Sequence, residues 1–173
     1  MESSKGKGWE VVESASKMVQ NVQLLDFIKN NEVYVGIQQK ETKREDEPIT
    51  NAELLFIHTN GSPVNNIPPR PVIEPAIKDD SERLSTMMKK AAQLVLEGNV
   101  AGAIRQLKLT GMRGQVVSRQ WFYNPKNNWP LNSPAVQEQK KKKGSTDPRP
   151  LIDTDELHKS ITYFVKTKGG RVE

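Results

Sequence analysis

The two histidines of this 173-residue chain are its first candidates for acid–base chemistry, because histidine titrates near neutral pH. His58 and His158 each fall in a segment expected to be helix or turn. Neither has a nucleophile beside it in a catalytic arrangement, and neither belongs to a metal-ligand spacing such as His-x-x-x-His. We therefore expect both histidines to have structural or solvent-facing roles.

The clustered acidic residues stand at predicted helix starts: Asp79, Asp80, Asp153 and Glu156. Capping of free N–H groups and the helix dipole explain acids at such places without acid–base catalysis. Gly169-Gly170 follows a predicted strand and precedes no helix, so it is not a phosphate-binding loop. We expect no enzymatic activity, no cofactor and no metal.

A run of four lysines, Lys140, Lys141, Lys142 and Lys143, closes a short predicted helix. Such a run can bind phosphates, and here it can face a DNA channel or an acidic neighbouring subunit. It is equally explained by solvation and by attraction to the negative end of the helix dipole. No aromatic residue interleaves with the run, so base stacking is unsupported.

Four aromatic residues gather late in the chain: Trp121, Phe122, Tyr123 and Trp129. They can anchor the loop over residues 123–133 onto the core. A contact between subunits is the alternative, since aromatic residues are enriched at interfaces.

Composition indicates one domain over residues 1–173 with a modest core, because 35% of the residues are hydrophobic and 6% aromatic. The net charge of +5 permits contact with nucleic acid without requiring it. The absence of cysteine excludes disulfides and thiolate metal sites. No apolar run approaches the roughly 20 residues of a membrane span. The first eight residues also lack the apolar stretch of a signal peptide. We expect a flexible start over about 1–8, synthesis in the cytoplasm and no membrane partner.

The first half of the chain alternates between helix and extended patterns. A helix is predicted over about 9–29, with one broken apolar stripe, followed by a strand over 32–37 and a charged loop or arm over 38–48. Thr50 and Glu53 stand in capping-box register for a helix over 49–60, which ends at Gly61. The stripe of the first helix consists of Val12, Ala15, Met18, Val19, Val22 and Leu25.

The segment 66–76 has four prolines but also Ile67, Val72 and Ile73, which makes it too apolar for a solvated linker. Its prolines exclude a helix and a regular central strand, so we predict an edge strand or a polyproline-like extended run over about 67–73.

Two helices are predicted next, over about 82–97 and 99–121, separated by Gly98 and capped by Asn99. Gly111, Gly114 and Ser118 share a face of the second helix; they either admit a close neighbour or merely weaken the helix. Ser133-Pro134 then starts a short helix. A basic loop over 140–150, one helical turn near Asp153 and a strand over 161–166 follow. The pattern predicts an α+β fold, in which a small antiparallel sheet packs with several helices and carries extended loops or arms.

Three segments in this order resemble a known family: 49–61 (ITNAELLFIHTNG), 67–73 (IPPRPVI) and 149–161 (RPLIDTDELHKSI). They are similar to the tail-completion or neck proteins of tailed bacteriophages, of the tail-component and virion-morphogenesis type. Those proteins show a helix ending HxxG, an IPxRPF-like segment and a late PLxDTGxLxxSI segment. The loop Trp129–Pro134 is similar to their W-P-L-S-P loop, and the resemblance covers about residues 33–165.

The resemblance implies a structural virion protein of the neck or tail, assembled in the host cytoplasm. Such a protein forms a homo-oligomeric ring, commonly a hexamer, that completes the tail and helps to join it to the head. The implied partners are further copies of itself, neighbouring neck, connector and tail-terminator or tail-tube proteins, and genomic DNA in the channel. The motif residues implied in assembly are Pro69, Arg70, Pro71, Trp129, Asp153, Thr154, Leu157 and Ser160.

Two positions depart from the family pattern. Asp155 stands where the family usually has glycine, so we expect that turn to be made differently or without a positive φ. Val72 stands where an aromatic residue is common, which implies a smaller contact after the Arg-Pro pair. The alternative function is a small basic nucleic-acid-binding module built on the helices over 82–97 and 99–121.

Overall fold

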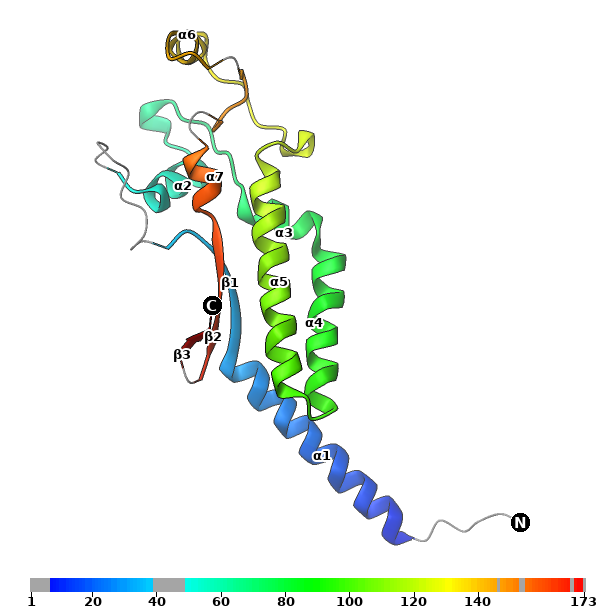
Figure 1. Cartoon of the computed structure of the whole chain (residues 1–173). Coiled ribbons are helices and arrows are strands. Elements are labelled where there is room, and N and C mark those ends of the chain that lie inside the picture. Colours follow the sequence, from blue (N-terminus) through cyan, green and yellow to red (C-terminus); the bar gives the residue numbers. More distant parts are fainter. Residues whose placement is uncertain (1–6, 39–48, 146, 153–154, 169, 173) are drawn as a thin grey trace. The chain divides into compact units, whose positions relative to one another are not determined.

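The computed structural model describes residues 7–38, 49–145, 147–152, 155–168 and 170–172. The chain is α+β, as the sequence predicts (Figure 1). Its elements follow in this order: α1 (Lys7–Asn30), β1 (Asn31–Gly36), α2 (Asn51–Asn60), η2 (Pro63–Asn65), α3 (Ile73–Asp79), α4 (Ser81–Leu96), α5 (Val100–Trp121), η3 (Pro125–Asn127), α6 (Pro134–Lys142), α7 (Glu156–Ser160), β2 (Thr162–Thr167) and β3 (Gly170–Val172).

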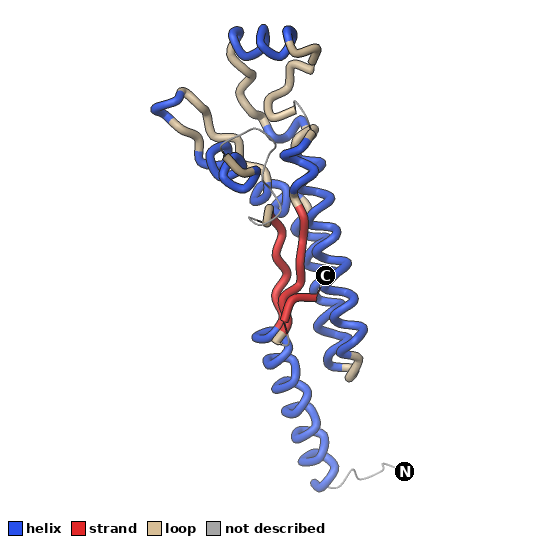
Figure 2. Tube along the Cα trace, turned by 60° about the vertical axis from the view of Figure 1, so that its left-hand side comes forward, coloured by secondary structure: helices blue, strands red, loops and turns tan. Residues whose placement is uncertain are grey.

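The three strands form one sheet in the order β1-β2-β3, drawn red in Figure 2. Strands β2 and β3 are antiparallel, with Val165 opposite Val172 and Thr167 opposite Gly170. Tyr34 of β1 stacks on Phe164 of β2, with ring centroids 4.9 Å apart. Cross-strand aromatic pairs of this kind stabilise a small sheet.

The chain divides into two compact units, each made of segments distant in sequence. Unit 1 comprises residues 1–34, 85–111 and 164–173, and unit 2 comprises residues 35–84 and 112–163. The boundaries between the two units fall inside helices and strands, because α4, α5, β1 and β2 each have residues in both units. The expected charged arm over 38–48 lies, apart from Gln38, outside the described residues.

In unit 1, α4 and the first half of α5 lie side by side as a helical pair (Figures 1 and 2). The amide of Asn99 donates to the carbonyl of Leu94, and the side chain of Asn99 accepts from the amide of Gly102, so Asn99 both ends α4 and caps α5 as predicted. Four apolar residues along the pair are buried, Ala91, Val95, Ala103 and Leu107, whereas Met88 and Val100, which the same periodic pattern places on the buried face, are exposed.

Helix α1 forms where predicted, but its apolar stripe is not part of a core. Val12, Met18, Val19, Val22 and Leu25 are each more than half exposed. The helix is held from its other side, where Phe27 is buried, Leu24 is half-buried and the Gln20 side chain donates to the carbonyl of Leu96.

Unit 2 has an apolar core built from α2, α3, the end of α5 and α7. Its buried members are Leu55, Val72, Ala76, Val117, Trp121, Phe122, Leu157 and Ile161. Gly114 lies against this core, and a Cβ there would stand 2.8 Å from Val35 Cγ2 and 3.3 Å from Ile77 Cδ1. The small residue therefore admits close neighbours, which are side chains rather than another backbone.

The predicted capping box of α2 is confirmed in both of its hydrogen bonds. The amide of Glu53 donates to the Thr50 hydroxyl at 3.2 Å, and the amide of Thr50 donates to the Glu53 carboxylate at 2.8 Å. The hydrogen bond from the Thr50 backbone lowers the pKa of Glu53, because it favours the charged carboxylate.

The proline segment is extended only in its first part. Ser62 and Ile67 form an isolated antiparallel bridge, and α3 begins at Ile73. The predicted strand over 67–73 and the exclusion of helix by Pro75 are therefore wrong. Pro75 is the third residue of α3, where a backbone N–H would have no acceptor within the helix and its loss costs nothing.

Gly61 ends α2 and lets the chain fold back onto itself. Its φ is 74°, and a Cβ there would lie 2.9 Å from both the Ile67 carbonyl oxygen and the Pro69 nitrogen. Backbone atoms cannot move aside as a flexible side chain can, so this position requires glycine for both its conformation and its space.

Gly61→Ala should lower the free energy of unfolding more than Gly144→Ala does. Gly144 has a similar φ of 83° but nothing within 4 Å of a Cβ, so its substitution carries only the conformational cost of roughly 1–2 kcal/mol. The clash at Gly61 should add about 1–3 kcal/mol. Urea denaturation followed by circular dichroism measures both variants, and equal losses would show that the backbone contact at Gly61 is unimportant.

Candidate functional site

Arg70 is a buried cation in unit 2. Arg70 is only 6% exposed. Its Nη2 donates to the Pro130 carbonyl at 3.0 Å and to Asn132 Oδ1 at 3.4 Å. Its backbone amide donates to the carbonyl of His58 near the end of α2. Burial lowers the pKa of the guanidinium, which still remains charged. Arg70 thus ties α2 to the loop after η3.

Trp129 makes the reciprocal hydrogen bond, from the loop at 129–132 to the segment at 70–71. Its indole Nε1 donates to the carbonyl of Pro71 at 3.2 Å, and its ring meets the edge of Phe122 at a centroid distance of 5.7 Å. The segment at 70–71 and the loop at 129–132 therefore exchange side-chain hydrogen bonds. We call these two segments and their reciprocal bonds the Arg70–Trp129 clamp.

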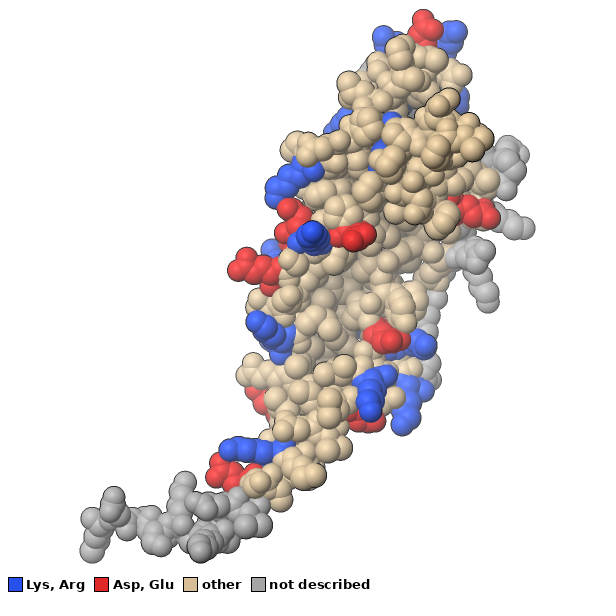
Figure 3. All heavy atoms as spheres, turned by 180° about the vertical axis from the view of Figure 1, so that it is seen from behind, with Lys and Arg blue, Asp and Glu red and all other residues tan. Residues whose placement is uncertain are grey.

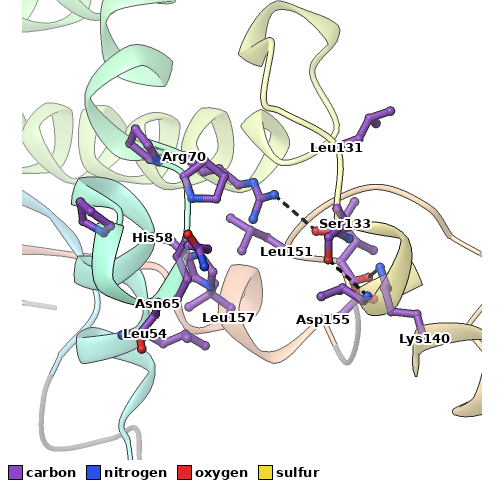
Figure 4. Close-up of a pocket in the computed structure, with 18 residues that line it drawn as sticks. Leu54, His58, Asn65, Arg70, Leu131, Ser133, Lys140, Leu151, Asp155 and Leu157 are labelled. Atoms are coloured by element: carbon purple, nitrogen blue, oxygen red, sulfur yellow. Dashed lines mark hydrogen bonds between the residues drawn. The ribbon is translucent and has the colours of Figure 1, made fainter. Parts of the chain in front are cut away.

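Beside the clamp lies an open cavity of about 1240 Å³, contained within unit 2. Figure 4 shows the Arg70 guanidinium pointing across it toward the loop that carries Leu131 and Ser133. Ten of its 18 lining residues are apolar, and its charged or titratable lining groups are His58, Arg70, Lys140 and Asp155. Concave sites that mix apolar walls with polar groups are where ligands commonly bind.

His58 is kept neutral inside this site. Burial and, to a smaller extent, the positive charge of Arg70 together lower its pKa to about 4. Its Nδ1 is buried and has no hydrogen-bond partner. The predicted structural role agrees with this position, although the imidazole also lines the cavity.

Lys140 is not a free member of the lysine run. It is 7% exposed, and its ammonium donates to the carbonyls of Arg149 at 2.9 Å and Ile152 at 2.5 Å. The expected role of Lys140 at a DNA channel is therefore wrong, because its charge is directed into the protein. The predicted basic loop over 140–150 is also partly helical, since α6 continues to Lys142.

Lys141, Lys142 and Lys143 do remain exposed at the end of α6. Burial of one lysine in four leaves a shorter charged cluster than the sequence suggests. On the face shown in Figure 3, Lys and Arg side chains stand among Asp and Glu and form no continuous basic surface in the described part of the chain.

Asp155 occupies its turn with φ 62°, the conformation that glycine would adopt most easily. The expectation of a turn without a positive φ is therefore wrong, because Asp155 itself adopts the left-handed conformation. Asp tolerates the left-handed conformation better than most residues. The Asp155 carboxylate accepts from the Tyr123 hydroxyl at 3.1 Å and lies 3.6 Å from His158 Nδ1, which helps to hold the strained turn.

Helix α7 is fixed at its C-terminal end by Arg119 of α5. The guanidinium donates to the carbonyls of Lys159 at 2.7 Å and Ile161 at 2.9 Å. The Ser160 hydroxyl donates to the Leu157 carbonyl at 2.7 Å. These bonds satisfy carbonyls that the end of a helix leaves free.

The structure brings most of the predicted motif residues together. Pro69, Arg70, Leu157 and Lys140 line the cavity, Pro71 and Trp129 belong to the clamp, and Ser160 fixes the end of α7. Asp153 and Thr154 lie outside the described residues. No local pattern in the sequence reveals Arg119, Asn132 or Tyr123 as hydrogen-bond partners, because each bonds a residue at least 32 positions away.

Two further observations concern metal binding and membrane crossing. Among the described residues, no group of three or more His, Cys, Asp or Glu is placed to hold a metal ion. No helix in the described part of the chain is both long and apolar enough to cross a membrane. The cavity offers apolar contacts to a bound group, whereas the Arg70 and Lys140 cations in its lining already bond carbonyls of their own chain.

No protein-family model matches the chain, and no curated protein and no solved structure is significantly similar to it.

Lys140→Met should lower the free energy of unfolding by roughly 1–3 kcal/mol, because methionine keeps the apolar stem but leaves the buried Ile152 carbonyl and the partly buried Arg149 carbonyl without their charged donor. Lys141→Met, at the exposed neighbouring position, should change it by less than about 0.5 kcal/mol. Urea denaturation compares the two. A similarly small loss of stability for both variants would show that the hydrogen bonds of Lys140 do not stabilise the protein.

Proposed function

We propose that this chain is a structural virion protein of the bacteriophage neck or tail, which completes the tail as a ring-forming subunit. The proposal rests on the resemblance of the three sequence segments and the Trp129–Pro134 loop. One observation carries it furthest: these segments, separated in sequence, meet around one clamp and one cavity in unit 2. If the motif residues of these segments are needed for packing against one another, they are expected to be close in the folded chain.

The directions of the side chains support an assembly role over a nucleic-acid-binding one. Arg70, Arg119 and Lys140 donate to backbone carbonyls of their own chain. Nucleic-acid binding draws its affinity from cations that neutralise phosphates. Cations committed to internal bonds contribute little to it. Exposed cations do remain, among them Lys141, Lys142 and Lys143 at the end of α6.

The cavity gives the ring a place at which one subunit can hold another. An extended segment of a neighbouring subunit or of an adjacent neck protein can pack against the apolar lining residues Leu54, Leu131 and Leu157. A ring subunit needs two different contact surfaces, one for each neighbour, and such a cavity serves as one of them.

Native mass spectrometry and negative-stain electron microscopy of the purified full-length protein test the proposal. Closed rings are expected, with a subunit number that is a multiple of six. Leu131→Asp, at an exposed cavity position, should reduce ring formation, whereas Phe56→Asp, at an exposed apolar residue of α2 outside the cavity lining, should not.

Binding of duplex DNA measured over a salt series gives the opposing outcome. The proposal predicts weak binding. Failure to form rings, together with DNA affinity that falls steeply with salt, would instead favour the basic nucleic-acid-binding module.

A further inference from the structure

Asn60 and Gly61 form the one Asn-Gly pair of the sequence, and they stand where α2 ends. In such a pair the backbone nitrogen that follows asparagine can attack the side-chain amide carbon, because glycine has no Cβ to crowd that nitrogen. Asn60 is exposed, so water and base can reach its side chain. The pair is therefore a candidate site for deamidation, a covalent modification that needs no enzyme.

The reaction has two steps. The Gly61 N–H first gives up its proton to a base, the nitrogen bonds to Asn60 Cγ, and the bond from Cγ to Nδ2 breaks. Ammonia leaves, and a cyclic imide remains. Water then opens the imide at either of its carbonyls. The product is aspartate at position 60, or isoaspartate, in which the main chain runs through the former side chain and gains a carbon atom. The balance requires only water, and no oxidant or metal.

In the folded chain both reacting groups are held by the end of α2. The Gly61 amide donates to the Ile57 carbonyl at 2.7 Å, which keeps the proton on the nitrogen that must attack. The Asn60 side-chain amide donates to the Phe56 carbonyl at 2.8 Å, which directs this side chain back along the helix. Attack needs Asn60 Cγ beside the Gly61 nitrogen instead. Both hydrogen bonds must therefore open before the imide can form.

We propose that Asn60 is a deamidation site that is closed while α2 is formed and reacts when α2 opens. A single helix opens locally at a lower cost in free energy than a whole unit unfolds. The modification therefore records how often α2 has opened. This chemistry does not depend on ring formation.

Neither product can rebuild the helix end as it was. Aspartate at position 60 replaces the amide that donates to Phe56 with a carboxylate, which also stands at the negative end of the helix dipole. Isoaspartate lengthens the main chain directly before Gly61. A Cβ on Gly61 would already lie 2.9 Å from the Ile67 carbonyl oxygen and from the Pro69 nitrogen, so there is little room beside this turn. Converted chains should therefore hold the segment that folds back onto α2 less tightly.

Peptide mapping by mass spectrometry tests whether the fold closes the site. Full-length protein is kept at mildly alkaline pH with and without denaturing urea, and conversion of the Asn60 amide to a carboxylate is followed over time. Conversion should be roughly tenfold faster or more in urea. In urea, Gly61→Ala should slow it, because a Cβ crowds the attacking nitrogen. Equal rates with and without urea, or no conversion in urea, would overturn the proposal.

Two destabilised variants separate opening of α2 from unfolding of unit 2. Thr50→Ala removes the N-cap, which weakens this ten-residue helix as a whole, and should raise the conversion rate in the folded chain about fivefold. Gly144→Ala strains the turn after α6, with nothing within 4 Å of the new Cβ, and should leave the rate unchanged. Circular dichroism confirms that each variant is folded. Equal acceleration by both variants, or by neither, would contradict reaction through opening of α2.

Urea denaturation of converted chains tests the consequence. Ion-exchange chromatography separates these chains, because they carry an additional negative charge. They should unfold at a lower urea concentration than unconverted chains, and so should Asn60→Asp, which reproduces the aspartate product. Identical midpoints for converted and unconverted chains would show that the helix end re-forms after the modification.

Discussion

Unit 2 is organised by a shortage of backbone hydrogen-bond donors. Proline contributes a carbonyl but no N–H, and prolines are concentrated in the segments 63–75, 125–134 and 148–150. Carbonyls in such segments cannot all be satisfied by a sheet or a helix, and leaving a buried carbonyl unpaired is costly. Side chains supply the missing donors. Arg70 donates to Pro130, Trp129 donates to Pro71, and Lys140 donates to Arg149 and Ile152. The Arg70–Trp129 clamp is the central case, since each side chain satisfies a carbonyl of the other's segment.

This constraint explains why basic residues of unit 2 are buried although the chain has a net positive charge. A buried cation is tolerated where acceptors lie beside it. The carbonyl of Pro130 serves Arg70, and those of Arg149 and Ile152 serve Lys140, although Arg70 Nε is buried without a partner. The same arrangement leaves His58 neutral, because the charge of Arg70 and the loss of water both oppose its protonation. The cavity therefore combines apolar lining residues with a neutral imidazole and with two cations that already bond their own chain.

Local sequence patterns predicted local features such as helix caps. They did not predict contacts that depend on residues distant in sequence. The capping box at Thr50 and Glu53, the Ser133-Pro134 helix start and the Asn99 cap depend on neighbours in sequence, and each is confirmed. Helix α3 was missed because its proline falls in the first turn, where it is harmless. The burial of Lys140 could not be predicted from the lysine run, since its acceptors lie in a different segment. The exposure of the α1 stripe was likewise hidden, because periodicity shows that a helix has an apolar face without showing what covers it.

A double-mutant cycle on the Arg70–Trp129 clamp tests the central claim most directly. Urea denaturation of the wild type, Arg70→Met, Trp129→Phe and the double variant gives four free energies of unfolding. Because each hydrogen bond holds the loop in place for the other, the two losses should not add, and the coupling should be about 1 kcal/mol or more. Losses that add to within about 0.3 kcal/mol would show that the two bonds act independently and would contradict the clamp as the organising interaction of unit 2.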